Sequence, residues 1–147
     1  MSSESRKWQA VVVDDDPCVT EIVEAYLAHD FAAGMDLVAF NDAWRAHDWL
    51  DRHNCDVLIS DIEMPGCNGL EMLRFAKQRN PWTAVIFMTA HSTWNHISEA
   101  VENGASDYLL KPIVQAELQQ VVRHECSRLM RWRSAVVGTL RPVMQRY

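Results

Sequence analysis

The sequence predicts an α/β fold in which a parallel sheet is covered by helices on both faces. Short apolar runs rich in β-branched residues alternate along the chain with segments whose apolar residues recur every three or four positions. Strands separated by helices must be joined by crossovers, and crossovers give a parallel sheet with helices on its faces. The 147 residues fit one domain, and the 48% of apolar residues can form a buried core.

Five apolar runs have the length and composition of buried strands. They span residues 10–13, 35–40, 57–59, 84–88 and 108–110. The first run is followed by turn-forming Asp and Pro residues, which favours a strand over a buried piece of helix.

Five segments between and after these runs have helical spacing of apolar residues. We expect helices at 17–28, from 41 or 42 to 50, from 68 or 69 to 80, at 94–102, and from 114 onward. The residues expected to begin or end them are Pro17, Asn41 or Asp42, Asn68 or Gly69, and Gly104 as a left-handed C-terminal cap.

The last helix is expected to be long and basic. Its apolar residues keep helical spacing from Leu118 to Val136, so the helix is expected to continue toward Gly138 or Pro142. Residues 114–147 carry six Arg and two Glu, a charge of +4, which leaves −10 on residues 1–113. An acidic body is a poor nucleic-acid binder. The basic tail is either a solvated final helix or a dimer contact or linker toward an output domain, and both readings stay open.

The chain divides into a polar segment at 1–8, one domain at 9–130, and a helical extension or linker at 131–147. It has no apolar run near the roughly 20 residues that span a bilayer and no signal-peptide pattern, so a cytoplasmic location without membrane partners is expected. The four cysteines form no CxxC pair and are expected to be reduced thiols.

Four chemical signals lie at the ends of predicted strands. Asp14, Asp15 and Asp16 follow the first strand, Asp61 the third, Thr89 the fourth and Lys111 the fifth. In a parallel sheet these strand ends meet at one edge, where ligands bind. Clustered carboxylates favour a hard cation such as Mg²⁺, and a carboxylate can accept a phosphoryl group. Each residue alone has a simple structural explanation, but all four signals together predict phosphoryl chemistry.

Over residues 9–130 the chain resembles the receiver domains of response regulators. The matching stretches are 12–17, 58–66 with Gly69, 85–90 and 104–112. The resemblance implies a flavodoxin-like, doubly wound sheet of five parallel strands in the order 2-1-3-4-5, with five helices. It also implies a signalling phosphoacceptor that is not an enzyme beyond its own phosphorylation and dephosphorylation.

The resemblance assigns roles at the predicted site. Asp61 would be the phosphoacceptor, Asp15 would bind Mg²⁺ directly, and Asp14 would help through a water molecule. The backbone carbonyl of Glu63 would be the third protein ligand of the metal, and Lys111 would pair with a phosphoryl oxygen.

The resemblance also assigns the switch and the lifetime of the phosphoryl group. Thr89 would be the switch hydroxyl and Tyr108 the aromatic switch residue, acting on the surface of the fourth helix, fifth strand and fifth helix. The side chains of Glu63 and His91 would tune phosphoryl lifetime. We therefore expect Glu63→Ala or His91→Ala to change the dephosphorylation rate more than the affinity for Mg²⁺. Asp16 would be an acid at a helix start.

The implied partners are a sensor histidine kinase or phosphotransfer protein, and a downstream protein target or a missing output domain. A homodimer through the C-terminal helix is possible, while a helix-turn-helix module has no room and no direct nucleic-acid binding is expected.

Two alternatives to this function remain. One is an Mg²⁺-dependent phosphatase with an aspartate nucleophile, although such enzymes usually place a second Asp where Glu63 stands. The other is a scaffold that binds through the terminal helix independently of phosphorylation.

Overall fold

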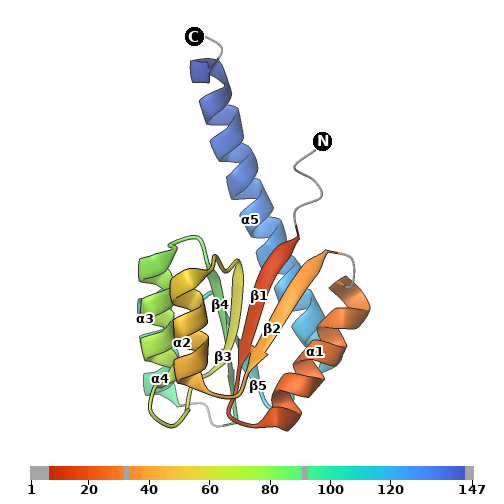
Figure 1. Ribbon diagram of the computed structural model, residues 1–147, viewed down its shortest axis with the longest axis vertical. Helices are drawn as coiled ribbons and strands as arrows, with labels where there is room; N and C mark the ends of the chain where they lie inside the picture. Colours follow the sequence, from red (N-terminus) through yellow and green to blue (C-terminus); the bar gives the residue numbers. More distant parts are fainter. Residues whose placement is uncertain (1–6, 32–33, 91–92, 145–147) are drawn as a thin grey trace.

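The computed structural model describes residues 7–31, 34–90 and 93–144. Within these ranges, strands and helices alternate strictly along the chain (Figure 1). The elements are β1 (Trp8–Val13), α1 (Pro17–Phe31), β2 (Met35–Phe40), α2 (Ala43–Arg52), β3 (Val57–Asp61), α3 (Gly69–Arg79), β4 (Ala84–Thr89), α4 (Trp94–Glu102), β5 (Asp107–Leu110) and α5 (Gln115–Met144).

The five strands form one parallel sheet in the order β2-β1-β3-β4-β5, so the predicted fold class and strand order are confirmed. The central strands β3 and β4 are buried along their whole length, and β1 is buried from Ala10 onward. A strand covered on both faces has no solvent-facing side, which explains why these segments are continuous apolar runs.

Two hydrophobic clusters lie on opposite faces of the sheet because successive strand residues point to opposite sides. On one face, Leu58 and Phe87 pack with α2, α3 and α4. On the other face, Ile59 and Ile86 pack with α1 and α5. Figure 1 shows the same division, with α2, α3 and α4 on one side of the sheet and α1 and α5 on the other.

Several boundaries differ from the sequence-based prediction by a few residues. β1 begins at Trp8 because the ladder with β2 already starts at the pair Trp8 and Met35. β3 continues to Asp61 because that residue still pairs with Met88 of β4. α1 runs to Phe31, three residues beyond the predicted end.

The open choices between helix caps are resolved by hydrogen bonds. Asp42 caps α2, since its carboxylate accepts a bond of 2.8 Å from the Trp44 N–H. Asn68 caps α3, since its side-chain oxygen accepts a bond of 2.9 Å from the Glu71 N–H. Gly104 follows α4 with a φ of 90°, in the left-handed region that was predicted for it.

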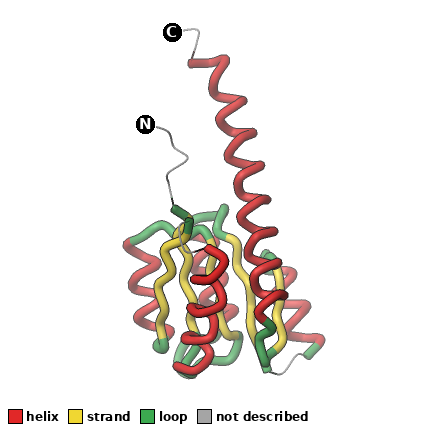
Figure 2. The backbone as a smooth tube through the Cα atoms, turned by 90° about the vertical axis from the view of Figure 1, so that its right-hand side faces the viewer, coloured by secondary structure: helices red, strands yellow, loops and turns green. Residues whose placement is uncertain are grey.

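The last helix is long, as predicted, and it continues past Gly138 and Pro142 to Met144. Its 30 residues correspond to about 45 Å of helix. The first half packs on the sheet through Leu118, Val122 and Leu129. Figure 2 shows that the second half projects beyond the sheet. The helix passes residue 130 without a break, and the division at 130 and 131 stays a prediction.

An ion pair with a buried carboxylate joins the start of this projection to the sheet. Asp56, just before β3, accepts a hydrogen bond of 2.8 Å from the Gln9 N–H and one of 2.6 Å from Nη2 of Arg133. The Arg133 guanidinium also lies 4.5 Å from the centre of the Trp8 ring. The sequence did not predict this contact, which anchors α5 at the edge of the sheet opposite the predicted site.

In the part of the chain described here, no helix combines the length and apolar character that crossing a bilayer requires.

Candidate functional site

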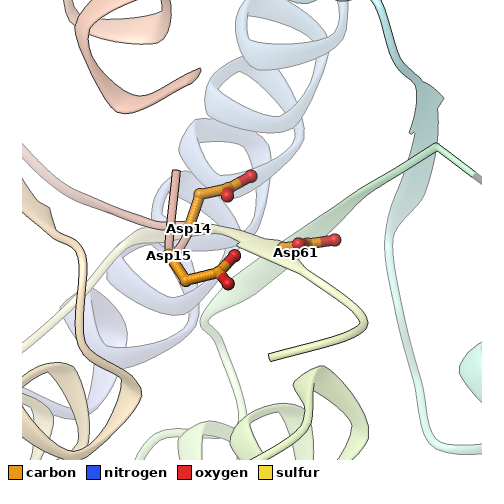
Figure 3. Close-up of side chains that lie close together, drawn as sticks. All are labelled: Asp14, Asp15 and Asp61. Carbon is orange, nitrogen blue, oxygen red and sulfur yellow. The ribbon is translucent and has the colours of Figure 1, made fainter. Parts of the chain in front are cut away.

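The side chains predicted at the strand ends come together at the carboxyl edge of the sheet. Asp14 and Asp15 follow β1, Asp61 ends β3, Thr89 ends β4 and Lys111 follows β5. One carboxylate oxygen from each of the three aspartates lies within 4.8 Å of the others (Figure 3). The geometry results from the topology, because all parallel strands end at this edge.

Asp14 is buried and held firmly by its surroundings. Its N–H donates to the Phe40 carbonyl at 3.1 Å, and its Oδ1 accepts from the Asp16 N–H at 2.9 Å. Nδ2 of Asn41 donates to the Asp14 carbonyl at 2.9 Å and to Oγ1 of Thr20 at 3.0 Å. From the sequence, Asn41 was expected only as a helix cap. Its place directly after β2, at the same edge, was the signal that could have identified it.

The other two aspartates of this loop differ from Asp14 and from each other. Asp15 is exposed, so its carboxylate is available to a ligand from solvent. Asp16 accepts a hydrogen bond of 2.9 Å from the Cys18 N–H, and its carbonyl accepts from the Val19 N–H at 3.1 Å. Asp16 therefore lies directly before α1 and accepts hydrogen bonds from its first turn, which agrees with a helix-start acid.

Lys111 bridges two of the three carboxylates. Its Nζ lies 2.7 Å from Oδ2 of Asp14 and 3.3 Å from Oδ2 of Asp61. Its N–H donates to the Thr89 carbonyl at 2.8 Å, and the Lys111–Pro112 peptide bond is cis. Burial lowers the pKa of Lys111, but the hydrogen bond and charge of Asp14, joined by Asp61, outweigh burial and raise this pKa. Lys111 is therefore a charged ammonium at neutral pH.

The environment of Asp61 disfavours its charged form. Burial is the main cause that raises the pKa of Asp61, and the negative charge of Asp14 adds to it. The ammonium of Lys111 and a hydrogen bond from the Glu63 backbone act in the opposite direction and do not fully compensate. Three carboxyl groups gather here around the single ammonium of Lys111. A hard divalent cation bound by carboxylate oxygens fits this cluster.

The two predicted switch residues lie on neighbouring strands. Thr89 is buried at the end of β4, and Tyr108 lies on the neighbouring strand β5, paired with Phe87. Burial raises the pKa of the Tyr108 hydroxyl, the Thr89 side chain beside it lowers this pKa, and the charges of Glu63 and Asp61 raise it, with a net upward shift. A displacement of Thr89 toward Asp61 would therefore change the surroundings of the Tyr108 side chain.

The remaining predicted residues are Glu63 and His91. Glu63 is exposed in the loop after β3, and its Oε1 lies 3.9 Å from Nδ1 of His96 on α4. His91 lies outside the described residues. The metal-binding role of the Glu63 carbonyl stays a prediction. His96 was not among the predicted site residues, because nothing in the sequence places α4 against the loop after β3.

Comparison with known proteins identifies the family. The family model of the response regulator receiver domain matches residues 10–123, most of the chain. The chain belongs to this family.

The relatives include the DNA-binding transcriptional regulator NtrC of Klebsiella pneumoniae, 42% identical over 103 residues, and NtrC of Escherichia coli strain K12, 43% identical over 101 residues. These alignments cover 70% and 69% of this chain and 21% of each relative. The response regulator protein PilR of Pseudomonas aeruginosa is 29% identical over 114 residues, covering 78% of this chain and 25% of PilR. The chain thus spans about a fifth of the length of the NtrC relatives.

Solved structures show the same fold. The signal receiver domain of a putative Luxo repressor protein from Vibrio parahaemolyticus matches with a TM-score of 0.80 at 22% identity, covering 88% of this chain and 97% of that one. The BeF3-activated DrrB receiver domain matches with a TM-score of 0.74 at 26% identity, covering 82% of this chain and 98% of that one. The protein is a receiver domain of two-component response regulators, a signalling domain whose acidic pocket fits a phosphoacceptor role.

Proposed function

We propose that Asp61 accepts a phosphoryl group, with Mg²⁺ held by Asp14, Asp15, Asp61 and the Glu63 carbonyl. The observation that carries this proposal is the convergence of three carboxylates and the Lys111 ammonium at one edge of the sheet. When bound, Mg²⁺ supplies positive charge that holds and neutralises the oxygens of the incoming phosphoryl group.

Asp61 and Lys111 carry out the remaining steps of the transfer. A carboxylate oxygen of Asp61 attacks the phosphorus of the donor, and the donor leaves with the electron pair of its broken bond to phosphorus. Cations at this edge favour the ionised, nucleophilic form of Asp61, whose pKa is otherwise raised by burial. Lys111 already contacts Asp61 at 3.3 Å and would form an ion pair with an oxygen of the phosphoryl group attached there.

The signal would leave the site through Thr89 and Tyr108. A phosphoryl group adds negative charge and acceptor oxygens beside the buried end of β4. The Thr89 hydroxyl would move to donate to one of these oxygens, and Tyr108, whose buried hydroxyl lies near Thr89 and has no hydrogen-bond partner within the ranges that the structure describes, would follow. The result is a shift in the population of two arrangements of the α4–β5–α5 surface.

The partners follow from this chemistry and from the family. A sensor histidine kinase or phosphotransfer protein would supply the phosphoryl group in the cytoplasm. An output domain, joined through the extension at 131–147, or a separate target would receive the signal. The exposed apolar side chains of Trp132, Val136 and Val137 on the projecting half of α5 support a dimer contact through this helix.

Small-donor phosphorylation tests the proposal. The chain is treated with acetyl phosphate and Mg²⁺, and intact-protein mass spectrometry follows the parent, Asp61→Asn and the control Asp16→Asn. We expect the parent and the control to gain one phosphoryl group and Asp61→Asn to gain none. A parent that gains no phosphoryl mass at saturating donor and Mg²⁺ would refute the proposal, and continuous turnover of a general phosphate ester would favour a phosphatase.

A further inference from the structure

A contact at the rim of the predicted site joins the loop after β3 to helix α4. Oε1 of Glu63 lies 3.9 Å from Nδ1 of His96, the third residue of α4. The His96 backbone is fixed, because its N–H donates to Oγ1 of Thr93, the N-cap of this helix, at 3.2 Å. The imidazole therefore comes from a defined position on α4.

The buried nitrogen of His96 gives this contact its physical basis. Among the described residues, Nδ1 of His96 is buried and has no hydrogen-bond partner. A buried polar atom without a partner is costly, and a carboxylate a few tenths of an ångström beyond bonding distance is the group that can satisfy it. Glu63 is exposed and free to adjust, so closing this gap requires movement of one side chain only.

Glu63 also borders the phosphoacceptor. Its backbone hydrogen-bonds to the Asp61 carboxylate. The negative charges of Glu63 and Asp61 both raise the pKa of Tyr108, so the Glu63 carboxylate lies near the site. A side chain at this rim, two residues after Asp61, can control the access of water to a group attached to that aspartate.

We propose that His96 is a positioning residue for Glu63: it holds the Glu63 carboxylate at the rim of the site and thereby lengthens the lifetime of the phosphoryl group on Asp61. This inference rests on the proposed function. The reaction affected is hydrolysis, in which a water oxygen forms a bond to phosphorus while the bond between Asp61 oxygen and phosphorus breaks. Asp61 leaves as a carboxylate with the electron pair, and inorganic phosphate departs as the attacking water gives up a proton to solvent.

The mechanism of the effect is steric and positional. While Glu63 is held by His96, it occupies the path along which water reaches the phosphorus atom. Without His96, the Glu63 side chain is released to solvent, the path opens and hydrolysis accelerates. The contact also links the lifetime of the phosphoryl group to α4, independently of Thr89 and Tyr108.

A double-mutant cycle tests the proposal. The parent, His96→Ala, Glu63→Ala and the double variant are phosphorylated with acetyl phosphate and Mg²⁺, the donor is removed, and phosphoryl loss is followed by intact mass. We expect His96→Ala to accelerate the decay by about two- to tenfold, the range that one hydrogen bond of ordinary strength gives. In the Glu63→Ala background the same change should have no further effect.

Two further variants separate positioning from a general structural effect. His96→Asn keeps a donor near the position of Nδ1 and should restore most of the parent lifetime, whereas His124→Ala, an exposed residue on α5, should decay like the parent. Equal decay of His96→Ala and parent, or a full His96→Ala effect without Glu63, would overturn the inference while leaving phosphorylation of Asp61 intact. If the parent is never phosphorylated, the proposed function itself fails.

Discussion

Removing the Arg133 side chain should destabilise the protein through the buried carboxylate that it leaves behind. Asp56 is only 5% exposed, and Nη2 of Arg133 lies 2.6 Å from its Oδ1. In Arg133→Ala the carboxylate keeps its bond from the Gln9 N–H but loses the ion pair with Arg133. The ring of Trp8 also loses the guanidinium that lies over it.

The expected loss can be worked out from these contacts. A hydrogen bond to a charged group contributes about 1.5–3 kcal/mol, and a cation over an aromatic ring contributes about 0.5–1 kcal/mol. The Arg133 side chain is 43% exposed, so solvent screens part of its interaction and the lower end of these ranges applies. We expect a loss of about 2 kcal/mol in the free energy of unfolding, or roughly 4–8 °C in Tm.

Urea unfolding and thermal melting of Arg133→Ala should be compared with Arg131→Ala. Arg131 lies two residues earlier on the same helix and is exposed, so its replacement should change stability by less than about 0.5 kcal/mol. If both variants unfold at the same urea concentration, Asp56 and Arg133 do not anchor the helix and the reasoning is wrong.

Three further predictions concern the site and the backbone near it. Because the pKa of Asp61 is raised above its ordinary value of 3.8 in the folded state, its ionised form destabilises the fold at neutral pH. Asp61→Asn should therefore melt higher than the parent at pH 7 without Mg²⁺, and the difference should shrink as the pH falls through the raised pKa; a constant or growing difference would contradict this sign. Mg²⁺ should raise the Tm of the parent, with a stabilisation of about 2.7 kcal/mol at about a hundredfold excess over Kd, and Asp15→Asn should lose most of that gain in a melting titration. Gly69→Ala should destabilise the protein by about 2–4 kcal/mol in urea unfolding, because the added Cβ would meet the Asp61 carbonyl oxygen and come within 2.7 Å of the Ile62 Cα. Gly138→Ala, in open space on α5, should instead stabilise the protein by up to about 1 kcal/mol. Similar effects at both positions would refute the steric argument.

The sequence determined the fold class and the set of residues at the main site. Strand and helix patterns are local, and the burial of β1, β3 and β4 on both faces appears directly as continuous apolar runs. Once parallel strands are assigned, their carboxyl ends must share one edge. The sequence alone therefore places Asp14, Asp61, Thr89 and Lys111 at one edge of the sheet.

The tertiary structure decided which of these groups touch and which distant residues support them. The sequence placed Lys111 beside a phosphoryl oxygen, but only the fold shows it between Asp14 and Asp61. Arg133 and Asp56 are separated by 77 positions, and His96 meets Glu63 from a different helix. Such contacts depend on the relative placement of packed elements, and no local periodicity encodes that placement. For this reason the sequence identifies the reacting groups, whereas the anchor of α5 and the position of the Glu63 side chain emerge only in the folded chain.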